Sequence, residues 1–210
     1  MRKATTLVAA LATILIAVPV LADQNAACGW EDGGDILSLF GNVGSYGNTG
    51  APDPVNSGLR SLTAVESPLG GTPQLYVAYI EGLTDGDEIT ACFYGYDDTP
   101  DASPSMRIWA HYAQSGDVDS YAGSASGNFT YTDGTGWSQV CHTWVFDSDT
   151  NTRDALVVEA RMYSIADGDT YFVDDLTVDI TSDTATITTP CPGPVSVDES
   201  TWGQTKAQYR

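Results

Sequence analysis

Two neighbouring acidic residues, Asp174 and Asp175, lie inside the ten-residue segment YFVDDLTVDI. The segment alternates like a β-strand, and this pattern places four apolar side chains on the same face as Asp174: Phe172, Leu176, Val178 and Ile180. A carboxylate that faces a hydrophobic core is costly unless it is hydrogen-bonded or binds a cation. Because an oxygen-only ligand set suits Ca²⁺, the pattern predicts either a calcium site or a dense polar network.

The elements around this segment are short alternating runs, and almost nothing in the chain has the pattern of a helix. Turn clusters rich in Gly and Asp separate these runs. The expected strands are Gln74–Ile80, Glu88–Tyr96, Ser105–Tyr112, Ser138–Phe146, Ala155–Tyr163 and Thr170–Ile180. Many short strands with such turns predict an all-β fold, a two-sheet antiparallel β-sandwich. The Gly- and Asn-rich stretch Gly41–Pro54 is expected to be a long surface loop.

Alternation also predicts which side chains leave the core. Apolar residues take the inner positions of Glu88–Tyr96 and Ser105–Tyr112. The outer positions then belong to one group of residues: Cys92, Tyr94, Tyr96, Arg107, Trp109 and His111. In Ser138–Phe146 the same reasoning turns Cys141 outward.

Four cysteines, an even number, predict disulfides, for which three pairings are open. Cys92 and Cys141 fall on the same face of their strands. A cross-strand bridge between them is therefore geometrically sensible if the two strands are neighbours. That pairing leaves Cys28 with Cys191, which would tie the two ends of the domain together.

The first 22 residues have the features of an export signal. Arg2 and Lys3 precede the apolar run Leu7–Leu21, which is short for a membrane span. We expect residues 1–22 to be a signal peptide, 23–190 one domain and 191–210 a C-terminal tail. The protein is therefore expected to be secreted, extracellular or periplasmic, without membrane insertion.

The chain is strongly acidic, with 28 Asp and Glu against 8 Lys and Arg. Loss of Arg2 and Lys3 with the signal peptide would take the formal charge from −20 to −22. Such a surface repels phosphates, so nucleic acids and anionic lipids are excluded as expected partners.

Five motifs in order resemble jelly-roll carbohydrate-binding modules of the galactose-binding-like superfamily, which are found beside secreted glycoside hydrolases. They cover the chain from about Gly29 to Ile180. The motifs are GWED at 29–32, SGLRSL at 57–62, GLTDGDEITACFYGYD at 82–97, GTGWSQVCHTW at 134–144 and YFVDDLTVDI at 171–180. The resemblance implies a structural Ca²⁺ between the first and last strands. The matching positions are Glu31 and Asp174, with Asp175 as an extra ligand.

The resemblance also implies a non-catalytic protein that captures a polysaccharide or other glycan on the outer face of the sandwich. Sugar sites combine an aromatic ring, which covers the apolar face of a pyranose, with polar groups for its hydroxyls. The outer positions offer Tyr94, Tyr96 and Trp109 as rings, with Arg107 and His111 as hydrogen-bonding groups. Glu159 and Arg161 are expected alongside.

Two other classes of function compete with glycan binding. Acid pairs in so acidic a chain carry no information about a glycosidase, and no nucleophile motif occurs, so we predict no enzyme. The alternative is an extracellular structural or adhesive protein that binds protein partners through the sandwich edge or the C-terminal tail Ser200–Arg210.

Overall fold

The computed structural model describes residues 24–97, 105–131, 136–164 and 166–191. Twelve strands and no helix lie in these ranges, in the order β1 (Gln24–Cys28), β2 (Ser38–Phe40), β3 (Val43–Gly50), β4 (Arg60–Glu66), β5 (Gln74–Glu81), β6 (Glu88–Asp97), β7 (Met106–Ala113), β8 (Ser124–Asn128), β9 (Ser138–Val145), β10 (Ala155–Met162), β11 (Asp169–Ile180) and β12 (Thr186–Thr188). No helix in this part of the chain could therefore cross a membrane. The predicted signal peptide and all of the predicted tail after Cys191 lie outside the described residues.

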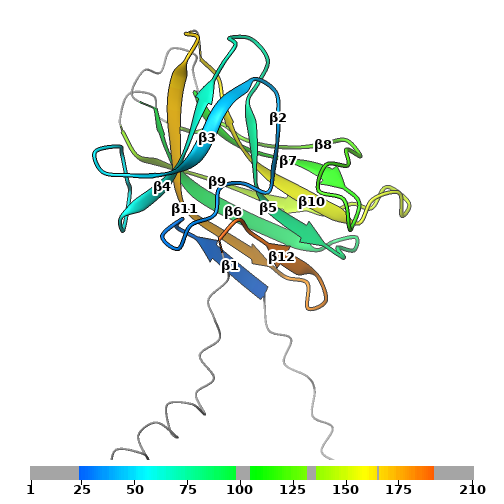
Figure 1. Cartoon of the computed structure of the whole chain (residues 1–210). Coiled ribbons are helices and arrows are strands. Elements are labelled where there is room, and N and C mark those ends of the chain that lie inside the picture. Colours follow the sequence, from blue (N-terminus) through cyan, green and yellow to red (C-terminus); the bar gives the residue numbers. More distant parts are fainter. Residues whose placement is uncertain (1–23, 98–104, 132–135, 165, 192–210) are drawn as a thin grey trace, which may run out of the picture.

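The strands form two antiparallel sheets packed face to face (Figure 1). Sheet A has the order β3-β4-β11-β6-β9, with β1 also paired to β11. Sheet B has the order β12-β5-β10-β7-β8, with β2 also paired to β5. The predicted two-sheet antiparallel β-sandwich is confirmed.

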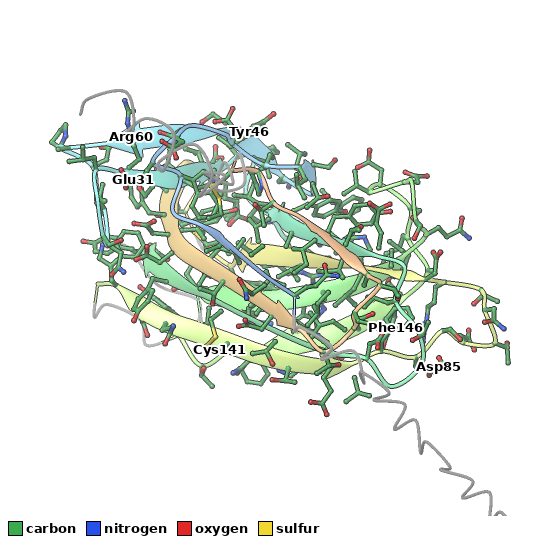
Figure 2. All side chains as sticks on the ribbon, turned by 90° about the horizontal axis from the view of Figure 1, so that it is seen from below. Glu31, Tyr46, Arg60, Asp85, Cys141 and Phe146 are labelled. Atoms are coloured by element: carbon green, nitrogen blue, oxygen red, sulfur yellow. A yellow bond between two sulfur atoms is a disulfide. The ribbon has the colours of Figure 1, made fainter. Side chains whose placement is uncertain are left out.

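The space between the sheets is filled by apolar side chains, among them Phe146, which Figure 2 labels in a view from below. The largest fully buried rings belong to Trp30, Phe93, Phe146 and Tyr171. All four lie in strands of sheet A or just after them, and sheet B contributes aliphatic side chains such as Leu75, Ile108 and Leu156 to the same core. Burial of this apolar surface is the main favourable term in folding such a domain.

The prediction of a long surface loop at Gly41–Pro54 is wrong, because this stretch contains strand β3. Residues Val43–Gly50 pair antiparallel with β4 and form the edge of sheet A. Gly and Asn are unfavourable in central strands, and this composition suggested a loop. An edge strand that is largely open to solvent tolerates them, because its side chains have little core to fill.

Both expected disulfides are present. Cys92 and Cys141 lie directly opposite each other on β6 and β9 and form a cross-strand bridge. Cys28 at the end of β1 is joined to Cys191, 163 residues later. The second bridge closes the domain where β1 and β12 lie against each other.

Candidate functional site

Strand β11 changes its neighbour halfway along, and the two acidic residues lie at the change. Its first half, Asp169–Val173, pairs with β4, whereas Leu176–Ile180 pairs with β1. Asp175 has a left-handed backbone with φ 49°, and the register with β6 shifts between Asp174 and Thr177. This β-bulge inserts a residue into the strand and reverses the phase of the side chains that follow.

The predicted facing of Asp174 toward the core is wrong because of this bulge. Tyr171 and Val173, before the bulge, point into the core. After the bulge, the residues that point into the core are Leu176, Val178 and Ile180. Phe172 and Asp174 lie on the opposite, outer side of sheet A. Asp174 is nevertheless fully buried, because the loop before β4 covers it.

The carboxylate of Asp174 accepts hydrogen bonds from three backbone N–H groups. Asn56 and Ser57 donate to its Oδ2 at 3.0 and 3.2 Å, and Asp175 donates to Oδ1 at 2.8 Å. The side chains of the same Asn56 and Ser57 donate to the Asp175 carboxylate, each at 2.7 Å. Burial raises the pKa of Asp174 to about 6, and the nearby Asp175 charge adds to this rise, although the N–H donors oppose it.

Glu31 approaches the same loop from the β1 side. Its Oε1 accepts hydrogen bonds from the backbone N–H groups of Leu59 and Arg60 at 2.7 and 3.1 Å. A Cβ at Gly58 would overlap this carboxylate, so the close approach requires glycine there. The opening and closing segments therefore lie side by side, as predicted, with Glu31 and Asp174 both hydrogen-bonded to the loop between them.

The fit of these residues to a calcium ion is limited. In the described ranges no group of three or more His, Cys, Asp or Glu side chains is arranged to hold a metal. The protein's own N–H and O–H groups donate hydrogen bonds to these carboxylates, where a bound cation would otherwise stabilise their charge. This arrangement matches the polar-network alternative. Calcium at Glu31, Asp174 and Asp175 stays a prediction.

The outer face of sheet B carries the second group of predicted site residues. Arg107, Trp109 and His111 alternate outward along β7, as predicted, because Met106, Ile108 and Ala110 fill the core. Strand β10 lies beside β7 and contributes two further charged side chains. Trp109 lies opposite Glu159 in the ladder, and Arg107 lies opposite Arg161.

Glu159 is the fully buried centre of this face. One of its carboxylate oxygens lies 2.5 Å from Nδ1 of His111, and the other is bonded to Nε of Arg161. Burial, and then the charge of Glu159, raise the pKa of the adjacent Tyr76 to about 12. A buried carboxylate is tolerated here because both oxygens have partners. Nε2 of the buried His111 has no hydrogen-bond partner in the described structure.

Aromatic rings accompany the charged groups along β7. Tyr121, with 70% of its surface exposed, places its ring 5.6 Å from that of His111. The guanidinium of Arg161 lies 5.1 Å from the centre of the Trp109 ring. The guanidinium of Arg107 lies 3.7 Å from the ring centre of Tyr163 and 5.6 Å from that of Phe129, which is 56% exposed. We use the name β7 face for the following residues: Arg107, Trp109, His111, Tyr121, Phe129, Glu159, Arg161 and Tyr163.

Sequence reasoning missed Tyr121, Phe129 and Tyr163. Tyr121 lies in a loop that folds back along β7, where Tyr112 exchanges backbone hydrogen bonds with Ala122 and Gly123. Phe129 directly follows the short strand β8, and Tyr163 directly follows β10. Tyr121 and Phe129 belong to no alternating run, and their only signal is a large ring in an otherwise polar stretch, whereas Tyr163 ends an expected strand without any feature that marks it as a site residue.

Tyr94 and Tyr96 do not belong to the β7 face, which corrects the prediction of a single binding surface. They point outward from β6, which is in sheet A, whereas Arg107, Trp109 and His111 are in sheet B. The chain crosses from sheet A to sheet B between β6 and β7. Side chains that point away from the core therefore point in opposite directions on these two strands. Tyr96 instead contacts Trp137 and Phe172, at ring distances of 5.5 and 6.0 Å.

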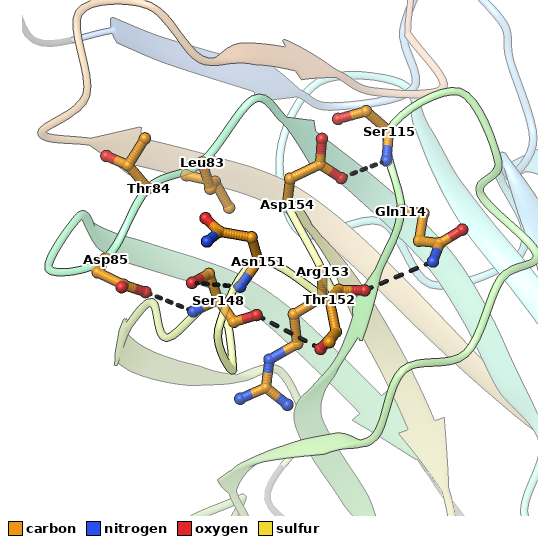
Figure 3. A pocket seen from close by; sticks show the side chains of 10 residues that line it. All are labelled: Leu83, Thr84, Asp85, Gln114, Ser115, Ser148, Asn151, Thr152, Arg153 and Asp154. Atoms are coloured by element: carbon orange, nitrogen blue, oxygen red, sulfur yellow. Dashed lines mark hydrogen bonds between the residues drawn. The ribbon is translucent and has the colours of Figure 1, made fainter.

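A separate open pocket of about 750 Å³ lies among the loops at one end of the sandwich (Figure 3). Two carboxylates that line the pocket accept hydrogen bonds from backbone N–H groups of other lining residues. Ser148 donates to Asp85, and Ser115 donates to Asp154. The guanidinium of Arg153 is bonded to the Asp147 carbonyl and stacks on Tyr112. These bonds explain the shape of the pocket as loop anchoring, and it presents no exposed ring.

No family model and no curated protein sequence matches the chain. Solved structures do. The CBM22-1 xylan-binding domain from Paenibacillus barcinonensis Xyn10C superimposes with a TM-score of 0.50 and 12% identity over 77% of this chain and 97% of that domain. The N-terminal CBM22-1-CBM22-2 tandem domain of the same protein gives 0.51 and 11% identity over 78% of this chain and 47% of the tandem. The likeness shows that this chain has the jelly-roll fold of carbohydrate-binding modules.

Proposed function

We propose that the protein is a non-catalytic glycan-binding module and that the β7 face is its binding surface. The observation that carries this proposal is the buried Glu159, which holds His111 and Arg161 beside exposed rings. Buried charge networks are costly, and they are common where a protein presents polar groups to a ligand. The other ion pair among the described residues, Arg153 with Asp147, also has a ring beside it, but its carboxylate is exposed, whereas Glu159 is fully buried.

The geometry suggests how a sugar would be held. The exposed ring of Tyr121 and the half-buried ring of Trp109 offer apolar surfaces for the C–H face of a pyranose. The N–H groups of Arg161 supply polar contacts for hydroxyls, and the buried ring of His111 packs against Tyr121. Because Glu159 fixes both of these side chains, little conformational entropy is lost when a ligand binds.

One solved module with this fold, the CBM22-1 domain, is described as xylan-binding, so xylan is the first polysaccharide to test. We also propose that the protein is exported, since both of its disulfides suit an oxidising compartment.

Affinity electrophoresis in gels that contain xylan or other plant and microbial polysaccharides tests the proposal. Wild-type protein should be retarded by at least one neutral polysaccharide, and Trp109→Ala and Tyr121→Ala should each weaken binding about tenfold. Tyr94→Ala is the matched control, because it removes an outward ring from the other sheet. Equal retardation of all four proteins would refute the assignment of the β7 face.

The alternative, an adhesive protein that binds protein partners, makes a different prediction. Its proposed tail, Ser200–Arg210, lies outside the described residues. If that function is correct, deletion of Ser200–Arg210 should abolish partner retention while Trp109→Ala retains it.

A further inference from the structure

The two arginines of the β7 face form an unusual pair. Arg107 and Arg161 lie directly opposite each other on β7 and β10, and side chains opposite in a ladder share one face of the sheet. Like charges in such positions repel unless an anion lies near them. The described residues contain only four cationic side chains, Arg60, Arg107, Arg153 and Arg161, in a chain with 28 acids. Half of these cations are therefore gathered on the β7 face.

The protein neutralises only one member of this pair. Glu159 binds Nε of Arg161 and also contacts His111, so its two oxygens are engaged. Within the described residues no carboxylate pairs with Arg107, and its buried Nε has no hydrogen-bond partner. Its guanidinium lies over the rings of Tyr163 and Phe129.

The setting of Arg107 differs from that of Arg153. Arg153 bonds the Asp147 and Ala122 carbonyls and pairs with the Asp147 carboxylate, so its donors serve the fold. Nε of Arg107 is buried, but its terminal NH₂ groups have no hydrogen-bond acceptor among the described residues, and the stacked Tyr163 ring holds the guanidinium plane in place. A fixed guanidinium with free donors is suited to a carboxylate or sulfate, which it binds through two parallel hydrogen bonds.

We infer that the β7 face recognises a glycan that carries an anionic sugar unit, with Arg107 as the residue that binds the anion. This inference rests on the proposed glycan binding and names its substrate class. The anion completes the neutralisation of the arginine pair, while Trp109 and Tyr121 hold the adjoining sugar rings. An acidic polymer is repelled by the rest of this surface, so recognition depends on this local positive site.

The test uses ligands that differ only in charge. Titration calorimetry measures the affinity of the intact protein for glucuronoxylan. It then measures the affinity for the same polymer after chemical reduction of its carboxyl groups. A sulfated galactan and its desulfated form are the second pair, which separates carboxylate from sulfate as the anion. The charged member of one pair should bind at least about tenfold tighter than its neutral partner.

Arg107→Gln should weaken binding of the charged partner about tenfold more than binding of the neutral partner and so abolish this difference, whereas Arg107→Lys should retain part of it. Arg60→Gln, which removes an exposed arginine from sheet A, is the matched control and should behave as the wild type. Circular dichroism checks that each variant is folded.

Three results would overturn the inference. Equal binding of charged and neutral partners by wild-type protein refutes anion recognition but leaves glycan binding intact. If Arg107→Gln reduces the affinity for the charged and the neutral ligand by the same factor, Arg107 binds hydroxyls only. Failure of the wild type to bind any charged or neutral polysaccharide refutes the proposed function, and the inference with it.

Discussion

Glu159 and Trp109 face each other across the β7–β10 ladder, a fully buried carboxylate beside a half-exposed indole. The indole Nε1 donates to Ser124 Oγ at 3.0 Å, so the ring is fixed from the β8 side. The carboxylate fixes His111 and Arg161 from the β10 side. Two strands on either side of β7 thus hold one polar and aromatic surface rigid.

Glu159→Gln should destabilise the protein and weaken glycan binding together. The substitution leaves Arg161 and His111 without their anion, and breaking a buried pair in this way typically costs about 3 kcal/mol. Urea unfolding measures the free energy of unfolding, and Glu88→Gln is the exposed control. Unchanged stability of Glu159→Gln would show that the network contributes nothing to the fold.

Asp174 should make the protein less stable as the pH rises from about 3.8 to about 6. Its pKa is raised in the folded state, so in this range the folded protein holds a proton that the unfolded chain has lost. Protonation therefore favours folding at the acidic end, and the whole penalty is present above about pH 6. Urea midpoints of wild type and Asp174→Asn are compared across this range.

The difference between those two proteins isolates Asp174, because burial raises the pKa of Glu66 as well and both proteins retain it. We expect Asp174→Asn to have the flatter profile. Parallel profiles would show that the Asp174 carboxylate titrates normally in the folded protein.

Calcium binding at Glu31, Asp174 and Asp175 would change this behaviour. A bound cation favours the charged carboxylates, so excess CaCl₂ should raise the melting temperature and remove the pH dependence due to Asp174. At a hundred times the dissociation constant the stabilisation would be about 2.7 kcal/mol. Differential scanning calorimetry in CaCl₂ and in EDTA measures it, with Asp174→Asn as the control. Identical melting in both solutions would leave hydrogen bonds as the sole explanation of the buried acids.

Removal of the Cys28–Cys191 disulfide should destabilise the protein more than removal of Cys92–Cys141. The loop that each bridge closes differs in length, with separations of 163 and 49 residues. The chain-entropy model gives about 5 and about 4 kcal/mol for these loops. Double Cys→Ala variants, unfolded in urea, provide the comparison. The reverse order would mean that strain or residual structure dominates over loop length.

Alternation predicted the strands that fill the core, because burial on one face imposes a period of two. It therefore placed Arg107, Trp109 and His111 outward correctly, and it aligned Cys92 with Cys141. Alternation says nothing about which sheet a strand joins. Tyr94 and Trp109 were assigned to one surface for that reason, although they lie on opposite sides of the molecule.

The phase of β11 could not be read from the sequence either. A bulge at Asp175 depends on the change of neighbour from β4 to β1, which is a property of the tertiary structure. The prediction of a costly buried carboxylate at Asp174 was nevertheless confirmed, with the loop at Asn56 rather than the core as its cover.

The bridge between Cys28 and Cys191 places the first and last described strands along one margin of the sandwich, the margin of β1 and β12 (Figure 1). In sheet B, β12 and β8 are the two opposite edges, and the β7 face lies toward β8. Gln24 and Cys191, the first and last described residues, accordingly lie on the β12 side of sheet B and not on the β8 side. A linker joined to either of these residues would therefore leave the chain on the side of the sandwich away from β8, which is compatible with access to the β7 face.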